Sequence, residues 1–203
     1  GEDKEIKKIF KKDYKGNYVD VGCFHPTRSN NTFKLYKTGW QGINIDLNPL
    51  TIELFNYARP NDINICAAIS NRETRKKLYF LGDLDSKNTL NLNHKKWVKK
   101  HFRIKNKDIR IKSVKTKKLN DILEKYNFNE IDFMNIDIEG HELEVIKSLN
   151  FKKYRINVIC IEILDYDDFS ANRKKKLKTF FKKNRYSLIG KSKINYIFKR
   201  KQQ

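Results

Sequence analysis

Short apolar runs alternate along this chain with segments whose apolar residues recur at helical spacing. Five runs predict strands, at residues 18–23, 42–47, 63–69, 131–136 and 158–164. Helical spacing separates them in four places, at residues 32–38, 49–59, 119–126 and 143–149. Repeated units of this length favour a parallel sheet whose crossover connections are right-handed.

The chain closes with a very basic helix and two strands. Leu177, Phe180 and Phe181 form the apolar stripe of the helix, and residues 186–189 and 194–198 predict a hairpin. A closing antiparallel strand is typical of the edge of a mixed sheet. We therefore predict an α/β sandwich, in which helices cover both faces of a mostly parallel sheet.

Two segments lie outside this alternation. Ile6, Ile9 and Phe10 share one face of a lysine-rich stretch, which predicts an amphipathic helix within residues 1–16 that lies on the body of the protein. Residues 83–108 are polar, basic and weakly periodic, so we expect a loop or cap over a cleft.

The strands beside this insertion are predicted to be short. Residues 77–81 and 110–115 have a strand-like pattern.

No Pro/Gly/Ser-rich linker interrupts the 203 residues, which predicts one domain over residues 1–203.

Composition indicates a folded protein without a membrane span. The hydrophobic fraction is 38% and the aromatic fraction 12%, enough for a core, in which we expect Trp40. No apolar run approaches the roughly 20 residues that cross a bilayer, so we expect a soluble, cytoplasmic protein. Cys23, Cys66 and Cys160 lie in apolar, strand-like contexts without CxxC spacing, which predicts buried, reduced thiols.

The net charge of +21 allows two interpretations. Lysine and arginine cluster at residues 95–107, 110–118, 173–185 and 199–201. Such surfaces attract phosphates, anionic glycans or nucleic acid. A chain this rich in Lys, Asn and Ile also fits an AT-rich genome, and we favour that interpretation. Nucleic acid is not favoured as a partner, because no zinc-finger or RNP-like pattern is present.

The clearest candidate for an active site follows the apolar run at residues 131–136. The run ends in Asp137, Glu139, Gly140, His141 and Glu142. Ligands of open α/β sheets bind just outside the carboxyl ends of such strands. Asp137 is therefore predicted to face a cleft.

Two earlier strands end in a similar way. Asp20 and Gly22 end the first strand, and Asp46 ends the second, where an acid is well placed to accept the hydroxyls of a ribose. The loop after Gly22 has none of the further glycines of a GxGxxG motif, which argues against NAD, FAD or ATP. A nucleoside without phosphates, such as S-adenosylmethionine, fits better.

Four motifs in order resemble the FkbM family of S-adenosylmethionine-dependent methyltransferases. They are residues 18–26 (YVDVGCFHP), 29–32 (SNNT), 39–46 (GWQGINID) and 136–142 (IDIEGHE). The resemblance covers about residues 17–165. It implies the class I methyltransferase fold, a Rossmann-like three-layer sandwich with a seven-stranded sheet. It also implies transfer of a methyl group to hydroxyl oxygens of sugars, polysaccharides or polyketide-type natural products.

The resemblance also implies roles for individual residues in binding S-adenosylmethionine. It places Asp20 and Gly22 near the methionine moiety and Asp46 on the ribose. It places the turn of Ser29, Asn31 and Thr32 near the methionine carboxylate, and the Ala67-Ala68 turn near adenine. Cys23, also in the cofactor loop, stands where alanine is common, and Pro26 replaces a later glycine of the loop.

Methyl transfer needs a group that takes or shares the proton of the acceptor hydroxyl. Asp137 is the first candidate for this base. Together with Glu162, it could instead hold a divalent metal such as Mg²⁺. Glu139 and His141 are further candidates, whereas Glu142 is better explained as an acid that favours the next helix through its dipole.

The leading hypothesis is therefore an O-methyltransferase that acts on a small-molecule or glycan acceptor. Methylation of RNA or protein is an alternative supported by the charge alone. A non-catalytic module that binds an anionic polymer on the same fold is a third.

Overall fold

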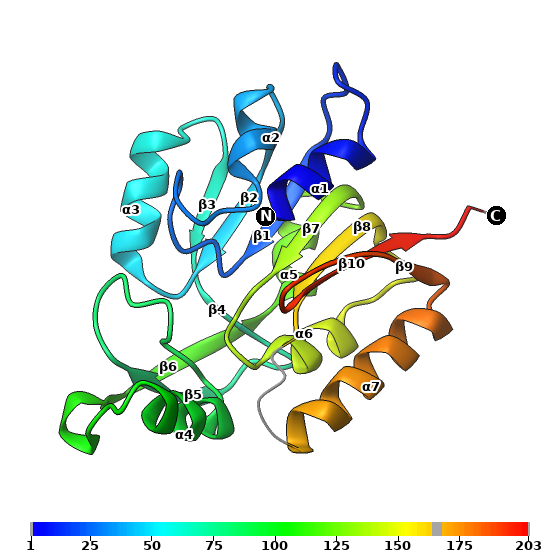
Figure 1. Cartoon of the computed structure of the whole chain (residues 1–203). Helices are drawn as coiled ribbons and strands as arrows, with labels where there is room; N and C mark the ends of the chain where they lie inside the picture. Colours follow the sequence, from blue (N-terminus) through cyan, green and yellow to red (C-terminus); the bar gives the residue numbers. More distant parts are fainter. Residues whose placement is uncertain (1, 164–167, 203) are drawn as a thin grey trace.

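The main sheet has seven strands, in the order β3-β2-β1-β7-β8-β10-β9 (Figure 1). This computed structural model describes residues 2–163 and 168–202. The strands are β1 (Asn17–Val21), β2 (Gln41–Asp46), β3 (Ile63–Cys66), β7 (Glu130–Ile136), β8 (Arg155–Glu162), β9 (Tyr186–Ser192) and β10 (Asn195–Arg200). Strands β3, β2, β1, β7 and β8 run parallel to one another, and β10 is antiparallel to both β8 and β9. The predicted mostly parallel sheet with an antiparallel closing strand is confirmed.

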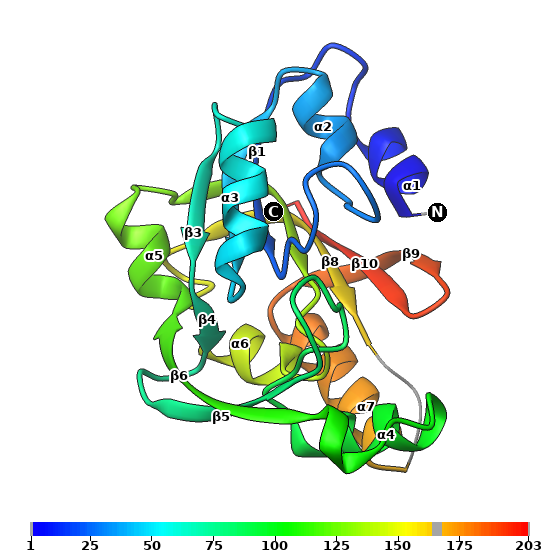
Figure 2. The same cartoon turned by 90° about the vertical axis from the view of Figure 1, so that its left-hand side faces the viewer.

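Helices cover both faces of the sheet, as Figures 1 and 2 show. One face carries α5 (Leu119–Lys125), α6 (Glu142–Ser148) and α7 (Asp168–Lys183), and the other carries α1 (Glu2–Ile9), α2 (Phe33–Lys37) and α3 (Pro49–Ala58). Alternation along β1 separates the two cores. Val19 packs in the core below α5, α6 and α7, whereas Tyr18 packs with Leu35 and Trp40 on the opposite face.

The N-terminal helix is held by an aromatic cluster. Ile6 of α1 is fully buried in the core that contains Trp40. Trp40 is buried as predicted, its Nε1 donates to Tyr14 O over 2.8 Å, and its ring lies 4.7 Å from that of Phe10. The helix therefore packs on the body of the protein.

The segment at residues 63–69, predicted as one strand, is divided between the main sheet and a second, three-stranded sheet. That prediction was wrong: β3 ends at Cys66, and β4 (Ala68–Ser70) pairs with β6 (Arg110–Lys118). β6 also pairs antiparallel with β5 (Arg75–Phe80). Ala67 lies at the break, where its N–H still donates to Asp46 O over 2.8 Å. A continuous apolar run does not reveal where a strand changes partners.

The segment at residues 83–108 contains a helix where a loop or cap was expected. α4 (Leu92–His101) starts at Asn91, whose side chain accepts hydrogen bonds from Asn93 N and His94 N. A 3-10 turn (Asn106–Asp108) follows. Only His94 and Val98 of α4 are buried, so its apolar stripe is too narrow to give clear helical periodicity.

The cysteines differ from the prediction in one case. Cys23 and Cys160 are buried, but Cys66 is exposed because it ends the edge strand β3. Among the described residues, no helix is both long and apolar enough to cross a membrane.

Candidate active site

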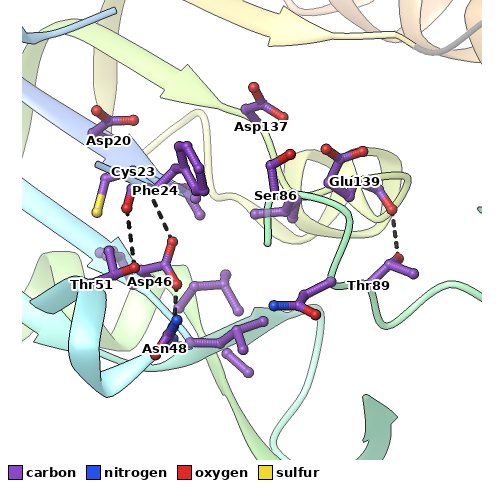
Figure 3. A pocket seen from close by; sticks show the side chains of 18 of the residues that line it. Asp20, Cys23, Phe24, Asp46, Asn48, Thr51, Ser86, Thr89, Asp137 and Glu139 are labelled. Carbon is purple, nitrogen blue, oxygen red and sulfur yellow. Dashed lines mark hydrogen bonds between the residues drawn. The ribbon is translucent and has the colours of Figure 1, made fainter. Parts of the chain in front are cut away.

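A cavity of about 310 Å³ opens at the carboxyl ends of β1, β2 and β7. Asp20, Asp46 and Asp137 all line it, although 117 positions separate the first from the last (137 − 20). In Figure 3, Asp46 and Thr51 lie on one side of the cavity and Glu139 on the other. Parallel strands bring their carboxyl ends to one edge of the sheet, which explains why these three acids meet.

Gly22 brings the ends of β1 and β7 into contact. Its φ is +82°, a conformation that favours glycine, and a Cβ at this position would collide with the main-chain oxygen of Asp137. Asp137 N in turn donates to Val21 O over 2.9 Å. The loop after β1 and the start of the acidic segment are therefore packed backbone to backbone.

Asp46 is fixed by main-chain donors. Its Oδ2 accepts from Phe24 N over 3.1 Å, and its Oδ1 accepts from Asn48 N over 2.8 Å (Figure 3). Burial raises the pKa of Asp46 to about 6. A carboxylate oxygen has more than one lone pair, so each can still accept a bond from a ribose hydroxyl.

Asp20 is fully buried and satisfied by side chains. Its Oδ2 accepts from Asn30 Nδ2 over 3.0 Å and from Thr32 Oγ1 over 2.9 Å, and its Oδ1 accepts from Asn135 Nδ2 over 2.9 Å. Burial raises the pKa of Asp20, while these donors and Arg59 oppose the rise. Thr32 was expected near the methionine carboxylate, but its side chain is buried against Asp20 and is not part of the cavity wall.

Arg59, at the end of α3, is a residue that the sequence analysis missed. Its guanidinium is fully buried and donates to Thr32 Oγ1 over 2.8 Å, to Asn30 Oδ1 over 2.7 Å and to Pro26 O over 2.9 Å. It also lies 4.9 Å from the ring of Phe55. An arginine before a proline at a helix end usually lies on the surface, so nothing in the sequence marked it.

The other predicted cofactor residues line the cavity. They are Gly22, Cys23, Ser29, Asn31, Ala67 and Ala68. Burial raises the pKa of the Cys23 thiol, so it is not a thiolate near neutral pH. Asn31 Nδ2 donates to Asn135 Oδ1 over 3.0 Å, which ties the Ser29 to Thr32 turn to β7.

Three carboxylates form a cluster beside the cavity. Oxygens of Asp137, Glu139 and Glu162 lie within 4.8 Å of one another, and the first two residues line the cavity. Burial, followed by repulsion from Asp137, raises the pKa of Glu139 to about 9. The same two causes raise the pKa of Glu162 well above its usual range. The negative charges of this buried cluster therefore oppose one another.

Glu142 closes the turn before α6. Its Oε1 accepts from Gly140 N over 2.7 Å and from Ile138 N over 3.3 Å. Both contacts lie at the start of the helix, as expected for an acid that stabilises this terminus. The turn thereby holds Glu139, whose φ is +53°, in place.

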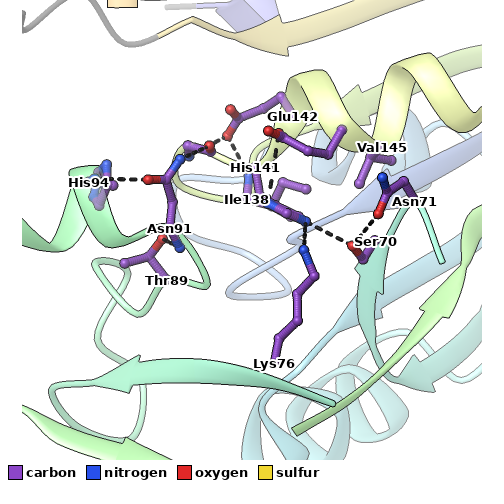
Figure 4. A network of polar contacts seen from close by, with 12 residues as sticks. Ser70, Asn71, Lys76, Thr89, Asn91, His94, Ile138, His141, Glu142 and Val145 are labelled. Atoms are coloured by element: carbon purple, nitrogen blue, oxygen red, sulfur yellow. Dashed lines mark hydrogen bonds and ion pairs between the residues drawn. The ribbon is translucent and has the colours of Figure 1, made fainter. Parts of the chain in front are cut away.

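His141 lines the cavity but is tied to the second sheet (Figure 4). Its Nε2 lies 2.9 Å from Ser70 Oγ and 3.4 Å from Lys76 Nζ, and its Nδ1 lies 3.8 Å from Glu144 Oε2. These contacts join α6 to β4 and β5. Ser70 therefore engages Nε2, one of the two ring nitrogens that a general base could use, whereas the contact of Nδ1 with Glu144 is longer than a hydrogen bond.

The segment before α4 forms the remaining wall, which the sequence analysis placed as a cap without identifying its residues. The lining residues from this segment are Leu84, Asp85, Ser86, Asn88, Thr89 and Leu90. Thr89 Oγ1 donates to Glu139 O over 2.7 Å, and Asn91 Nδ2 donates to Gly140 O. His94 Nε2 lies 3.2 Å from Glu139 Oε2. The cap is thus attached to the acidic segment.

The strand order and the position of the cavity define a class I S-adenosylmethionine-dependent methyltransferase. The profile described as "Methyltransferase FkbM domain" matches residues 16–188. The chain therefore belongs to the FkbM methyltransferase family, which confirms the resemblance of its motifs.

Solved structures resemble the chain at low sequence identity. The Methanococcus jannaschii fibrillarin pre-rRNA processing protein is 12% identical over 93% of this chain and 68% of its own, with a TM-score of 0.50. A TehB-like SAM-dependent methyltransferase from Corynebacterium glutamicum is 11% identical over 98% of this chain and 87% of its own, with a TM-score of 0.48. At this identity, the likeness to the fibrillarin structure shows the fold alone. A search of curated proteins found no match.

Proposed function

We propose that this methyltransferase transfers the methyl group of S-adenosylmethionine to a hydroxyl oxygen of a sugar, glycan or related natural product. The observation that carries the proposal is the shared cavity of Asp46 and Asp137. Asp46 would bind the ribose, and Asp137 would face the acceptor. In this proposal, residues 1–203 act as one domain, with α1 packed on its body and residues 83–108 as its cap.

In this proposal, residues predicted to bind S-adenosylmethionine contact different parts of it. Asp46 offers two fixed carboxylate oxygens to the ribose hydroxyls. Ala67 and Ala68 give an apolar wall for adenine, and Ser29 and Asn31 offer polar groups to the methionine end. Asp20 and Gly22 shape the loop that lies against the cofactor.

The acidic end suits the reaction electrostatically. The sulfonium of S-adenosylmethionine is a cation, and the product S-adenosylhomocysteine is neutral. The nearby Asp137 carboxylate therefore favours the charged donor over the product. Asp137 would take the proton of the acceptor hydroxyl as the methyl group is transferred in line.

RNA or protein as the acceptor is the second candidate. Its support is charge: residues 95–118 hold twelve lysines and arginines against one aspartate. Methyltransferases that modify N6 of adenine carry an Asn/Asp-Pro-Pro-Tyr/Phe motif after the corresponding strand, where this chain has Asp137-Ile138-Glu139-Gly140. A hydroxyl acceptor agrees better with this segment.

A calorimetric titration with S-adenosylmethionine tests the cofactor site. We expect binding by the wild type, loss of binding in Asp46→Ala, and unchanged binding in Asp13→Ala, whose residue is exposed on the far N-terminal segment. Transfer of a radiolabelled methyl group to a panel of glycans, RNA and protein then identifies the acceptor class. Labelling of RNA or protein alone would replace the proposed acceptor, and no cofactor binding would favour a non-catalytic module.

A further inference from the structure

The cluster of Asp137, Glu139 and Glu162 has features of an ion-binding site, in addition to the general base proposed above. We propose that these three carboxylates bind one divalent cation that prefers oxygen ligands, such as Mg²⁺, Mn²⁺ or Ca²⁺, at the acceptor side of the cavity. The ligands come from the end of β7, the turn after it and the end of β8. The structure thus adds Glu139 to the pair suggested by the sequence.

The spacing of the carboxylates fits one ion. Two ligands of one ion lie at most two bond lengths apart, which is roughly 4 Å for Mg²⁺ and roughly 5 Å for Ca²⁺. The three carboxylates each offer an oxygen within 4.8 Å of the other two. Oxygens within this limit can reach one ion after a small inward rotation of the side chains, which is smaller for Ca²⁺ than for Mg²⁺ or Mn²⁺.

Glu162 supplies an independent indication of a ligand. The residue is only 7% exposed, and its Oε2 is buried without a hydrogen-bond partner among the described residues. Burying an unsatisfied carboxylate oxygen is costly, because the oxygen has lost its water and gained nothing. A cation bound among the three carboxylates would satisfy it.

The surroundings hold two of the three residues in place. Glu139 Oε2 lies 3.2 Å from His94 Nε2, and the main-chain oxygen of Glu139 accepts from Thr89 Oγ1. The backbone of Asp137 is fixed by its hydrogen bond to Val21 O. A side-chain partner such as His94 orients a metal ligand.

An ion at this position would be open to the acceptor. Asp137 and Glu139 line the cavity, whereas Glu162 is buried and does not line it. The ion would therefore be covered by protein on the Glu162 side and accessible on the other. Carboxylate ligands without thiolate or imidazole favour Mg²⁺, Mn²⁺ or Ca²⁺ over Zn²⁺.

The role of the ion rests on the proposed function. A divalent cation lowers the pKa of a bound hydroxyl and orients it for reaction. Two neighbouring hydroxyls can bind one ion together. The substrate class that fits best is therefore a sugar or polyol with a vicinal diol.

Cation binding to the full chain tests the site without an acceptor. Calorimetric titrations with Mg²⁺, Mn²⁺ and Ca²⁺, together with the electron paramagnetic resonance signal of bound Mn²⁺, should reveal one site. Glu162→Gln and Asp137→Asn should each weaken binding by at least about tenfold, the scale on which removal of supporting groups alone affects metal sites. Glu130→Gln, at the exposed opposite end of β7, should leave it unchanged.

Two outcomes would overturn the inference: no cation binding by the wild type, or equal binding by the wild type and Glu162→Gln. Thermal melting and S-adenosylmethionine affinity show whether each variant is folded. Asp46→Ala separates the two proposals, because it should lose the cofactor and retain the cation. A protein that methylates an acceptor but binds no cation would refute only the cation site, whereas cation binding without cofactor binding would refute only the proposed function.

Discussion

Arg59 donates from Nη1 to the hydroxyl of Thr32 over 2.8 Å, and that hydroxyl donates to Asp20 over 2.9 Å. A buried guanidinium on α3 thus acts on a buried carboxylate on β1 through one side chain. The same guanidinium holds Asn30 and Pro26. From inside, it supports the loop after β1, which lines the cavity.

Arg59→Met should destabilise the fold and weaken cofactor binding. The substitution leaves the acceptors on Pro26, Asn30 and Thr32 without their donor, which should lower the free energy of unfolding by about 2 to 4 kcal/mol. Urea unfolding measures this change. Arg28→Met, at an exposed position of the same loop, is the matched control and should have little effect. Equal stability of the two variants would show that the loop does not depend on Arg59.

The affinity for S-adenosylmethionine should fall as the pH drops below about 6. Burial raises the pKa of Asp46 to about 6, so the folded protein takes up this proton at a higher pH than the unfolded chain. Protonation favours the folded state as the pH falls, but it removes the charge that accepts the ribose hydroxyls. The apparent Kd should rise roughly tenfold per pH unit below the pKa.

Calorimetry from about pH 5 to about pH 8 measures this dependence, because the range brackets the pKa of about 6. Asp46→Asn is the control: its binding should be weak, and any remaining pH dependence belongs to other groups. A wild-type profile that matches the variant's would remove Asp46 from the ribose site.

Asp137→Asn should reduce turnover while cofactor affinity stays nearly the same. Loss of a general base typically costs roughly 100-fold or more in rate. Single-turnover transfer of a labelled methyl group measures the chemical step directly. Asp121→Asn, at an exposed position of α5, controls for a general loss of charge. Unchanged turnover would assign proton removal to another group.

Acceptor binding should weaken with salt if the basic segment at residues 95–118 recruits an anionic acceptor. Screening shortens electrostatic attraction to about 10 Å at 0.1 M salt, so the apparent affinity should fall steeply as ionic strength increases. Measurements of KM over a salt series test this. A flat response would attribute these lysines to compositional bias.

The convergence of Asp20, Asp46 and Asp137 could be predicted because strand polarity alone determines it. Each acid follows an apolar run, and parallel pairing brings such ends together. Long-range pairing is different. The change of sheet at Ala67 depends on β6, which lies more than forty positions later, and no local pattern indicates it.

The burial of polar residues also could not be predicted from the sequence. Arg59 and Thr32 are fully buried because they satisfy each other and Asp20, a reason that exists only once the loop has folded. The exposure of Cys66 follows from the edge position of β3, which depends on the order of the strands. The helix α4 was missed because His94 and Val98 alone anchor it.

The attachment of the cap makes it modular. Thr89 and Asn91 donate to the main-chain oxygens of residues 139 and 140, which remain whatever side chain stands at position 139. The loop before them, which lines the cavity with Leu84, Asp85, Ser86 and Asn88, can therefore change while these two donors keep it docked. We expect chimeras that replace residues 83–88 to change the acceptor preference.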